Sequence, residues 1–133
     1  MKVTPIKSTG RCLITAFGAG GFRFGLPSGD LRIEGGVLVL ADIPEPWPVQ
    51  SMSALAPSSL DQVVALAGKV KFLLMGTGDR LIALPPFLRS HLNDHGVGLE
   101  IMDTAAACRA YNHLASEGRH FVAALLPVGT APA

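Results

Sequence analysis

Hydrophobic and polar residues alternate near the start of the chain, which is the pattern of a half-buried β-strand. In RCLITAF, residues 11–17, one face carries Cys12, Ile14 and Ala16. The glycine-rich run GAGG at 18–21 then leads into FRFG, so the pattern predicts a β-hairpin. A phosphate-binding loop is the alternative interpretation, but a strand rather than a helix follows the glycines.

The next segment extends the β-rich part of the chain. A turn at LPSGD, residues 26–30, precedes LRIEGGVLVLA at 31–41, where Val37–Leu40 form a continuous apolar run typical of a strand. The segment ADIPEPWPV at 41–49 contains three prolines. We interpret it as a rigid surface connection.

After Pro57 the hydrophobic period changes to three or four residues, which predicts a helix that Gly68 ends. Its apolar positions are Leu60, Val63, Val64 and Ala67. Ser59 and Gln62 fit a capping box at its start. The run VKFLLM at 70–75 is apolar apart from Lys71, as expected for a strand buried on both faces of a parallel sheet.

Helical and strand patterns alternate over the rest of the chain. A helix is predicted to begin near LPPF, residues 84–87, because prolines suit a first turn, and to end at Gly96. Its apolar face consists of Leu84, Phe87, Leu88 and Leu92. A strand at 97–102, a helix from Asp103 or Thr104 to Glu117 and a strand at 120–127 follow. This order predicts an α/β fold with a mostly parallel sheet and crossover helices, beside an N-terminal antiparallel hairpin.

Composition limits the number of domains and the classes of partner. A chain of 133 residues with 49% hydrophobic content can form one core, so we predict a single domain over 1–133 with a frayed tail at 127–133. The 11 basic and 10 acidic residues nearly cancel, which argues against a nucleic-acid partner. Neither a signal peptide nor an apolar run of about 18 residues is present, so we expect a soluble, cytoplasmic protein without membrane insertion. Cys12 and Cys108 lack C-x-x-C spacing, and no metal or cofactor is predicted.

The segment CRAYNH at 108–113 gathers reactive residue types within one predicted helix. At about 100° per residue, Cys108 and Tyr111 fall on the core face, whereas Arg109, Asn112 and His113 lie on the other. These side chains therefore cannot converge on one substrate. We interpret Cys108 and Tyr111 as packing residues rather than catalytic ones, and the opposite face as solvated or as a protein-binding surface.

A candidate binding loop follows the predicted strand at 70–75. Two glycines after a buried strand allow backbone N–H groups to approach an anion at the carboxyl edge of a parallel sheet. The candidate residues are Gly76, Thr77, Gly78, Asp79 and Arg80, with Asp103, Thr104 and Arg109 at the border. A tight turn explains the glycines equally well, and N-capping explains Asp103 and Thr104.

Other chemically distinctive residues have simpler interpretations. His91 and His95 are four residues apart, which permits metal chelation, but packing near a helix end is the alternative. Trp47 either anchors its proline-rich loop or offers an apolar surface to a partner. The sequence shows no nucleophile with an adjacent base in a recognised spacing, so no catalytic residues are predicted.

The run FLLMGTGDR and the later GVGLEIMDTAAACRAYNHLASEGRHFVAALLP together resemble the Mth-type domain of unknown function. The specific signature is E-x-M-D-T-x-x-A-x-R-x-Y-N-x-L-x-x-E-G-R, residues 100–119, and GVLVLADIPEPWPV also fits. Ala110 and His120 depart from the family pattern. The resemblance implies a three-layer α/β fold, with a mixed, mostly parallel central sheet, its helices and an extra β-layer. Relatives include a mitochondrial complex I assembly factor and an adipogenesis-associated protein.

Two functions follow from these observations. The favoured one is a non-catalytic interaction or assembly module, with a membrane-complex subunit as the partner that the resemblance implies. The alternative is a small-ligand-binding protein or enzyme with its site at the loop of residues 76–80.

Overall fold

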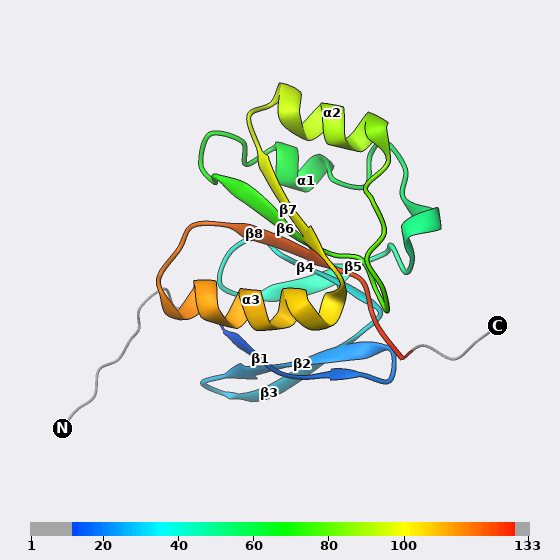
Figure 1. Cartoon of the computed structure of the whole chain (residues 1–133). Helices are drawn as coiled ribbons and strands as arrows, with labels where there is room; N and C mark the ends of the chain where they lie inside the picture. The colour runs from blue at the N-terminus through cyan, green and yellow to red at the C-terminus, as the bar shows by residue number, and fades with distance from the viewer. Residues whose placement is uncertain (1–11, 130–133) are drawn as a thin grey trace.

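The computed structural model describes residues 12–129 and contains two β-sheets (Figure 1). The smaller sheet is antiparallel and consists of β1 (Leu13–Gly18), β2 (Gly21–Leu26) and β3 (Gly29–Glu34). The larger sheet has the strand order β5-β4-β8-β6-β7. Its strands are β4 (Gly36–Val39), β5 (Pro44–Trp47), β6 (Phe72–Gly76), β7 (Gly98–Met102) and β8 (Val122–Leu125).

The helices complete a layered α/β arrangement. They are a 3-10 turn at Met52–Ala54, α1 (Asp61–Val64), α2 (Pro86–Asp94) and α3 (Thr104–Ser116). Figure 1 shows α3 between the two sheets, with α1 and α2 on the opposite face of the five-stranded sheet. The predicted fold class, including the extra antiparallel layer, is therefore confirmed. None of the helices within residues 12–129 is long and apolar enough to cross a membrane.

The five-stranded sheet is mixed, as predicted, and its two halves have different origins. Strand β6 pairs in parallel with both β7 and β8, because α2 and α3 are the crossovers that connect these strands. Strand β4 pairs antiparallel with β8 and with β5, its neighbour in the chain. Thus two of the four pairings are parallel, all in the half that the predicted crossovers build.

Each face of the five-stranded sheet has its own hydrophobic core. The first core lies toward α3 and the small sheet, and its largest members are Phe22, Phe24, Tyr111 and Phe121. The second core lies toward α1 and α2 and includes Leu38, Trp47, Leu60, Leu88 and Leu92. Because apolar side chains leave both faces of β6 and β8, the continuous apolar run of β6 was a correct signal of a doubly buried strand.

The proline-rich segment at 41–49 is not only a connection, because it contains β5. Proline lacks an N–H and fits a strand only where that position faces away from the neighbouring strand. Pro44 and Pro46 alternate along β5 and so meet this condition at the edge of the sheet. The interpretation of this segment as a surface connection was therefore wrong in its central part.

The first helix and the second differ from their predicted details. The capping box was wrong: Leu60 is the N-cap of α1, and the Ser59 hydroxyl accepts a hydrogen bond from the Ala56 N–H instead (2.8 Å). Phe87 does not face the core, since 49% of it is exposed. Phe87 belongs to the first turn of α2. The buried residues of this helix are Leu88 and Leu92.

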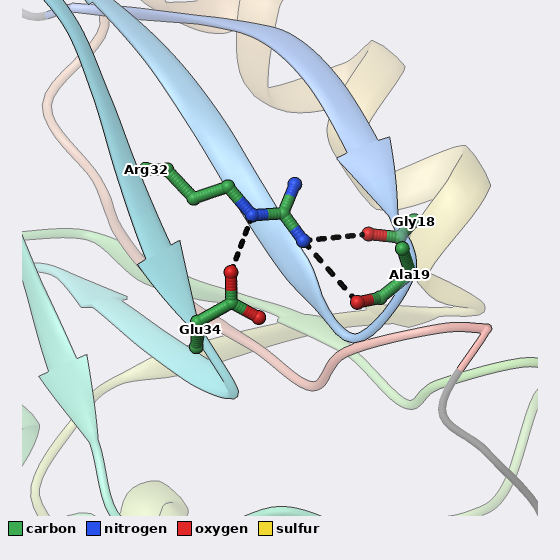
Figure 2. Close-up of polar contacts among 4 residues, drawn as sticks. All are labelled: Gly18, Ala19, Arg32 and Glu34. Carbon is green, nitrogen blue, oxygen red and sulfur yellow. Dashed lines mark hydrogen bonds and ion pairs between the residues drawn. The ribbon is translucent and has the colours of Figure 1, made fainter.

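The hairpin predicted at residues 18–21 is present, and Arg32 holds its turn (Figure 2). The Arg32 guanidinium donates to the carbonyls of Gly18 (3.1 Å) and Ala19 (3.2 Å) and to the Glu34 carboxylate (2.6 Å). The hydrogen bond with Glu34 raises the pKa of Arg32 and lowers that of Glu34. Ala19 has a φ of 52°, so this clamp fixes a turn whose backbone is unusual for a residue with a side chain.

Candidate functional site

The loop of residues 76–80 lies at the carboxyl end of β6, where ligands bind in many α/β proteins. The Thr77 N–H donates to the carbonyl of Met102 and thereby continues the pairing with β7 (3.0 Å). The Thr77 hydroxyl donates to the Arg80 carbonyl (2.6 Å) and accepts from the Ile82 N–H (3.2 Å). The side chain of Thr77 therefore stabilises the turn rather than pointing into a cavity.

Thr104, at the first position of α3, joins three segments at this edge. Its hydroxyl donates to the Leu126 carbonyl (2.7 Å) and accepts from the Gly78 N–H (2.9 Å). The Thr104 N–H donates to the Gly78 carbonyl (3.0 Å). A Cβ on Gly76 would lie 2.9 Å from the Thr104 hydroxyl, so glycine is required there by close packing. The structure thus brings Thr104, Gly76 and Gly78 together as predicted, with their polar groups bonded to one another.

Asp103 and Asp79 also bond within the chain. An Asp103 carboxylate oxygen accepts from the Ala106 N–H (2.9 Å), which is the N-cap interaction of α3. An Asp79 oxygen accepts from the N–H of Gly129 (3.2 Å). The predicted frayed tail at 127–133 is described only as far as Gly129, and this part bonds to the body of the protein.

The segment at residues 127–129 passes next to the candidate loop of residues 76–80. The carbonyl of Val128 accepts from the Gly20 N–H in the β1–β2 turn (2.9 Å). Gly129 lies so close to this turn that a Cβ on it would be 2.9 Å from the Ala19 nitrogen. Residues 127–129 therefore connect the loop of residues 76–80 to the hairpin, at the edge where a ligand would otherwise enter.

Arg109 lies apart from this loop, in a different environment. It lines a groove of about 300 Å³ between α3 and β1, together with Cys108, Asn112 and Ala16. Burial raises the pKa of the Cys108 thiol to about 12, while the charge of Arg109 acts in the opposite direction. The thiol is therefore neutral at physiological pH, which agrees with the predicted packing role. Whether the predicted site residues bind a ligand or partner stays a prediction.

Asn112 has a role that the helical pattern did not reveal. Its amide accepts from the Ile14 N–H (2.8 Å) and donates to the Ile14 carbonyl (2.9 Å), so it pairs with β1 as a neighbouring strand would. Tyr111 donates from its hydroxyl to the Cys12 carbonyl (2.7 Å). Asn112 was assigned to the outward face of the helix, which was wrong because β1 covers that part of α3. The 98-residue separation of the partners gives no local sequence signal.

Comparison with known proteins identifies the family. The family model described as "Protein of unknown function (DUF498/DUF598)" matches residues 14–126. The chain belongs to this family. This match confirms the resemblance stated from the signature at residues 100–119, which forms β7, α3 and the turn after it.

Relatives of this DUF498/DUF598 chain include proteins named as assembly factors and an uncharacterized protein. It is 40% identical over 116 residues to an uncharacterized protein of Rhodobacter capsulatus, covering 86% of this chain and 84% of the relative. It is 37% identical over 86 residues to NADH dehydrogenase [ubiquinone] 1 alpha subcomplex assembly factor 3 of Xenopus tropicalis. That match covers 65% of this chain, which spans 47% of the assembly factor's length.

A solved structure supports the fold of the DUF498/DUF598 chain. A Mth938-like domain of Bordetella pertussis superposes with a TM-score of 0.78 at 31% identity. The alignment covers 98% of this chain and 95% of that domain. The fold of this chain is therefore shared with that domain.

The remaining candidates in the DUF498/DUF598 chain have structural roles. Trp47 is buried, and its indole N–H donates to the Ser59 carbonyl (3.1 Å), so it anchors its segment. The rings of His91 and His95 are 4.8 Å apart, and the His95 Nδ1 lies 2.9 Å from the His91 carbonyl. Within residues 12–129, no group of three or more His, Cys, Asp or Glu side chains is arranged to hold a metal.

Proposed function

We propose that this chain is a non-catalytic interaction module that acts in the assembly of a multisubunit complex. The observation that carries the proposal is the bonding at the carboxyl edge of the sheet, where the polar groups of Thr77, Gly78 and Thr104 are used within the chain. Residues 127–129 also cross this edge. A fold whose usual ligand edge is occupied by its own chain is better suited to present its outer surfaces.

Exposed apolar side chains beside α2 support a protein-binding role. Leu81, Ile82 and Phe87 are between 43% and 60% exposed, although each is a large hydrophobic residue. Phe87 also lines a groove of about 400 Å³ with Pro57, Asp61 and His91. Contiguous apolar surface marks protein interaction sites, and these three side chains lie within seven residues of one another in the sequence.

The relatives support the choice of partner. The relative from Xenopus tropicalis is named as an assembly factor of the NADH dehydrogenase complex. We infer a subunit of a membrane complex as the partner of this chain and the cytoplasm as its compartment, where its Cys12 and Cys108 thiols remain reduced.

Affinity capture with chemical crosslinking tests the proposal. The tagged chain, expressed in its native host, is purified from membrane and non-membrane fractions, and captured proteins are quantified by mass spectrometry against a tag-only control. We expect one or a few membrane-complex subunits to be enriched with crosslinks to this chain. Enrichment of nothing over the control in either fraction would contradict the proposal.

A ligand screen tests the alternative directly. Thermal unfolding is measured with nucleotides, phosphorylated metabolites and divalent metals, and we expect no stabilisation. A ligand at a hundredfold excess over its Kd would stabilise the fold by about 2.7 kcal/mol. Such a shift, if lost in a Thr104→Val variant that still folds, would favour a small-ligand site at residues 76–80.

A further inference from the structure

The outer edge of β7 carries backbone groups that bond to nothing else within residues 12–129. In the parallel ladder with β6, Gly98 donates from its N–H to the Lys71 carbonyl, and the Met102 carbonyl accepts from the Thr77 N–H. Alternate residues of a strand bond to opposite sides, so Leu99 and Ile101 direct their N–H and C=O groups away from β6. Figure 1 shows β7 at the end of the sheet.

Of the other three edge strands in the two sheets, β5 and β1 are closed. At the opposite edge of the same sheet, the outward positions of β5 are Pro44 and Pro46, which have no N–H to donate. At the β1 edge of the small sheet, the Asn112 amide bonds to the N–H and to the carbonyl of Ile14. The third, β3, is the outer strand of the small sheet on the side away from β1. Edge strands tend to be protected in folded proteins, so the open edge of β7 requires an explanation.

Grooves border β7 on both faces. On the α3 side, a groove of about 390 Å³ is lined by apolar residues such as Met102, Ala110 and Leu114, together with Glu100, His113 and Arg119. On the α2 side, a groove of about 410 Å³ includes Leu92, Val97 and Leu99. Side chains of an added strand would alternate between the two faces and enter these grooves in turn.

The charge of β7 decides what kind of strand fits. Glu100 is exposed at the centre of the strand and forms no ion pair among residues 12–129. A second copy of the chain, paired antiparallel with full overlap, would place Leu99 opposite Ile101 and Glu100 directly opposite Glu100 of the copy. Like charges at directly opposed positions destabilise a strand pair, whereas opposite charges stabilise it.

We propose that β7 binds an extended segment of a partner protein by strand addition, with a lysine or arginine opposite Glu100 and apolar residues beside it. This proposal rests on the proposed function, that the chain binds protein partners, and it names the surface and the chemistry of the partner segment. The backbone groups of Leu99 and Ile101 provide the affinity, and Glu100 selects the basic residue.

A mixing experiment tests the edge without knowledge of the natural partner. The Glu100→Lys chain itself offers an exposed strand with a basic residue opposite Glu100 of the wild-type chain. We expect amide NMR signals of Leu99 and Ile101 to shift in a millimolar mixture, with loss of the shift at high salt, and not in either chain alone. An unchanged spectrum in the mixture would overturn the proposal. Shifts in the wild-type chain alone would assign the edge to a second copy instead.

Partner capture provides the second measurement, with Glu45→Lys as the matched control. Glu45 lies at the corresponding position of β5, on the closed edge, so both variants change the net charge equally. We expect Glu100→Lys to reduce the captured partner about tenfold and Glu45→Lys to leave it unchanged. Equal capture by all three chains would overturn this inference while the proposed function stands. Capture by none of them would remove the proposed function itself.

Discussion

The two edges of the five-stranded sheet differ in the chemistry of their backbones. Strand β5 is four residues long, has prolines at its outward positions and is fixed to the core by Trp47. Strand β7 directs the backbone N–H and C=O groups of Leu99 and Ile101 away from the sheet, and its residues are only partly buried. The same sheet therefore ends in one edge whose outward positions lack N–H donors and in one whose outward positions keep them.

The difference shows two ways of protecting an edge. Proline removes the donor itself, so no partner of any sequence can restore the missing hydrogen bond. A charged residue such as Glu100 leaves the backbone available and discriminates only by the side chain placed opposite. A closed edge is thus permanent, whereas a charged edge is selective.

Truncating the apolar anchor of each edge should give the largest contrast. Trp47→Ala removes a buried indole and leaves the Ser59 carbonyl without its donor, so we expect a loss of about 3–5 kcal/mol in unfolding free energy. Leu99→Ala, at a half-buried position on β7, should cost about 1 kcal/mol. Urea unfolding followed by circular dichroism measures both. Equal losses would mean that β7 is fixed to the core as firmly as β5.

Opening the β1 edge of the small sheet should have the next largest effect. Asn112→Ala removes both hydrogen bonds to Ile14, and we expect a loss of about 1–3 kcal/mol. Asn112→Asp keeps the acceptor for the Ile14 N–H but loses the donor, so its stability should lie between those of the alanine variant and the wild-type chain. An alanine variant as stable as the wild-type chain would show that this edge needs no side chain to close it.

The unfolding free energy should depend on pH through the buried Cys108 thiol. The pKa of Cys108 is raised to about 12 in the folded chain, from an ordinary value of 9.0. The unfolded thiol ionises first, so the stabilisation is complete below pH 9 and declines as pH rises toward 12. We expect a loss of about 1 kcal/mol by pH 10 relative to pH 7. A Cys108→Ala variant should lack this component; an identical pH profile in both chains would contradict it.

The rim of the groove beside β7 should contribute least to stability. His113 and Glu117 form an exposed pair one helical turn apart (3.2 Å). Because solvent screens such pairs, His113→Ala should change the unfolding free energy by less than about 0.5 kcal/mol. A loss above 1 kcal/mol would show that the His113–Glu117 pair stabilises the fold as well as bordering the groove.

Much of the crossover half could be predicted from the sequence, because its signals are local. The helical period of residues 104–117, the capping Asp103 and the terminating Gly118 specify α3 without reference to the rest of the chain. Strand β6 was equally clear, because an apolar run between glycines is typical of a doubly buried strand.

The missed features depend on position in the fold rather than on local pattern. Prolines argue against a strand, and only the edge location of β5 makes Pro44 and Pro46 compatible with pairing. Asn112 was assigned to solvent because a helical pattern with one apolar face implies one covering layer. Helix α3 has two layers around it, so a polar residue on its second side meets the backbone of β1.

The chain contains one tryptophan and one tyrosine, and they lie in different cores. Trp47 belongs to the core beneath α1 and α2, and Tyr111 to the core between α3 and the small sheet. The intrinsic fluorescence of each ring therefore reports on one face of the sheet without any label. If the two signals change together during denaturation, the sheet and both of its coverings unfold as one cooperative unit; if they separate, one face opens first.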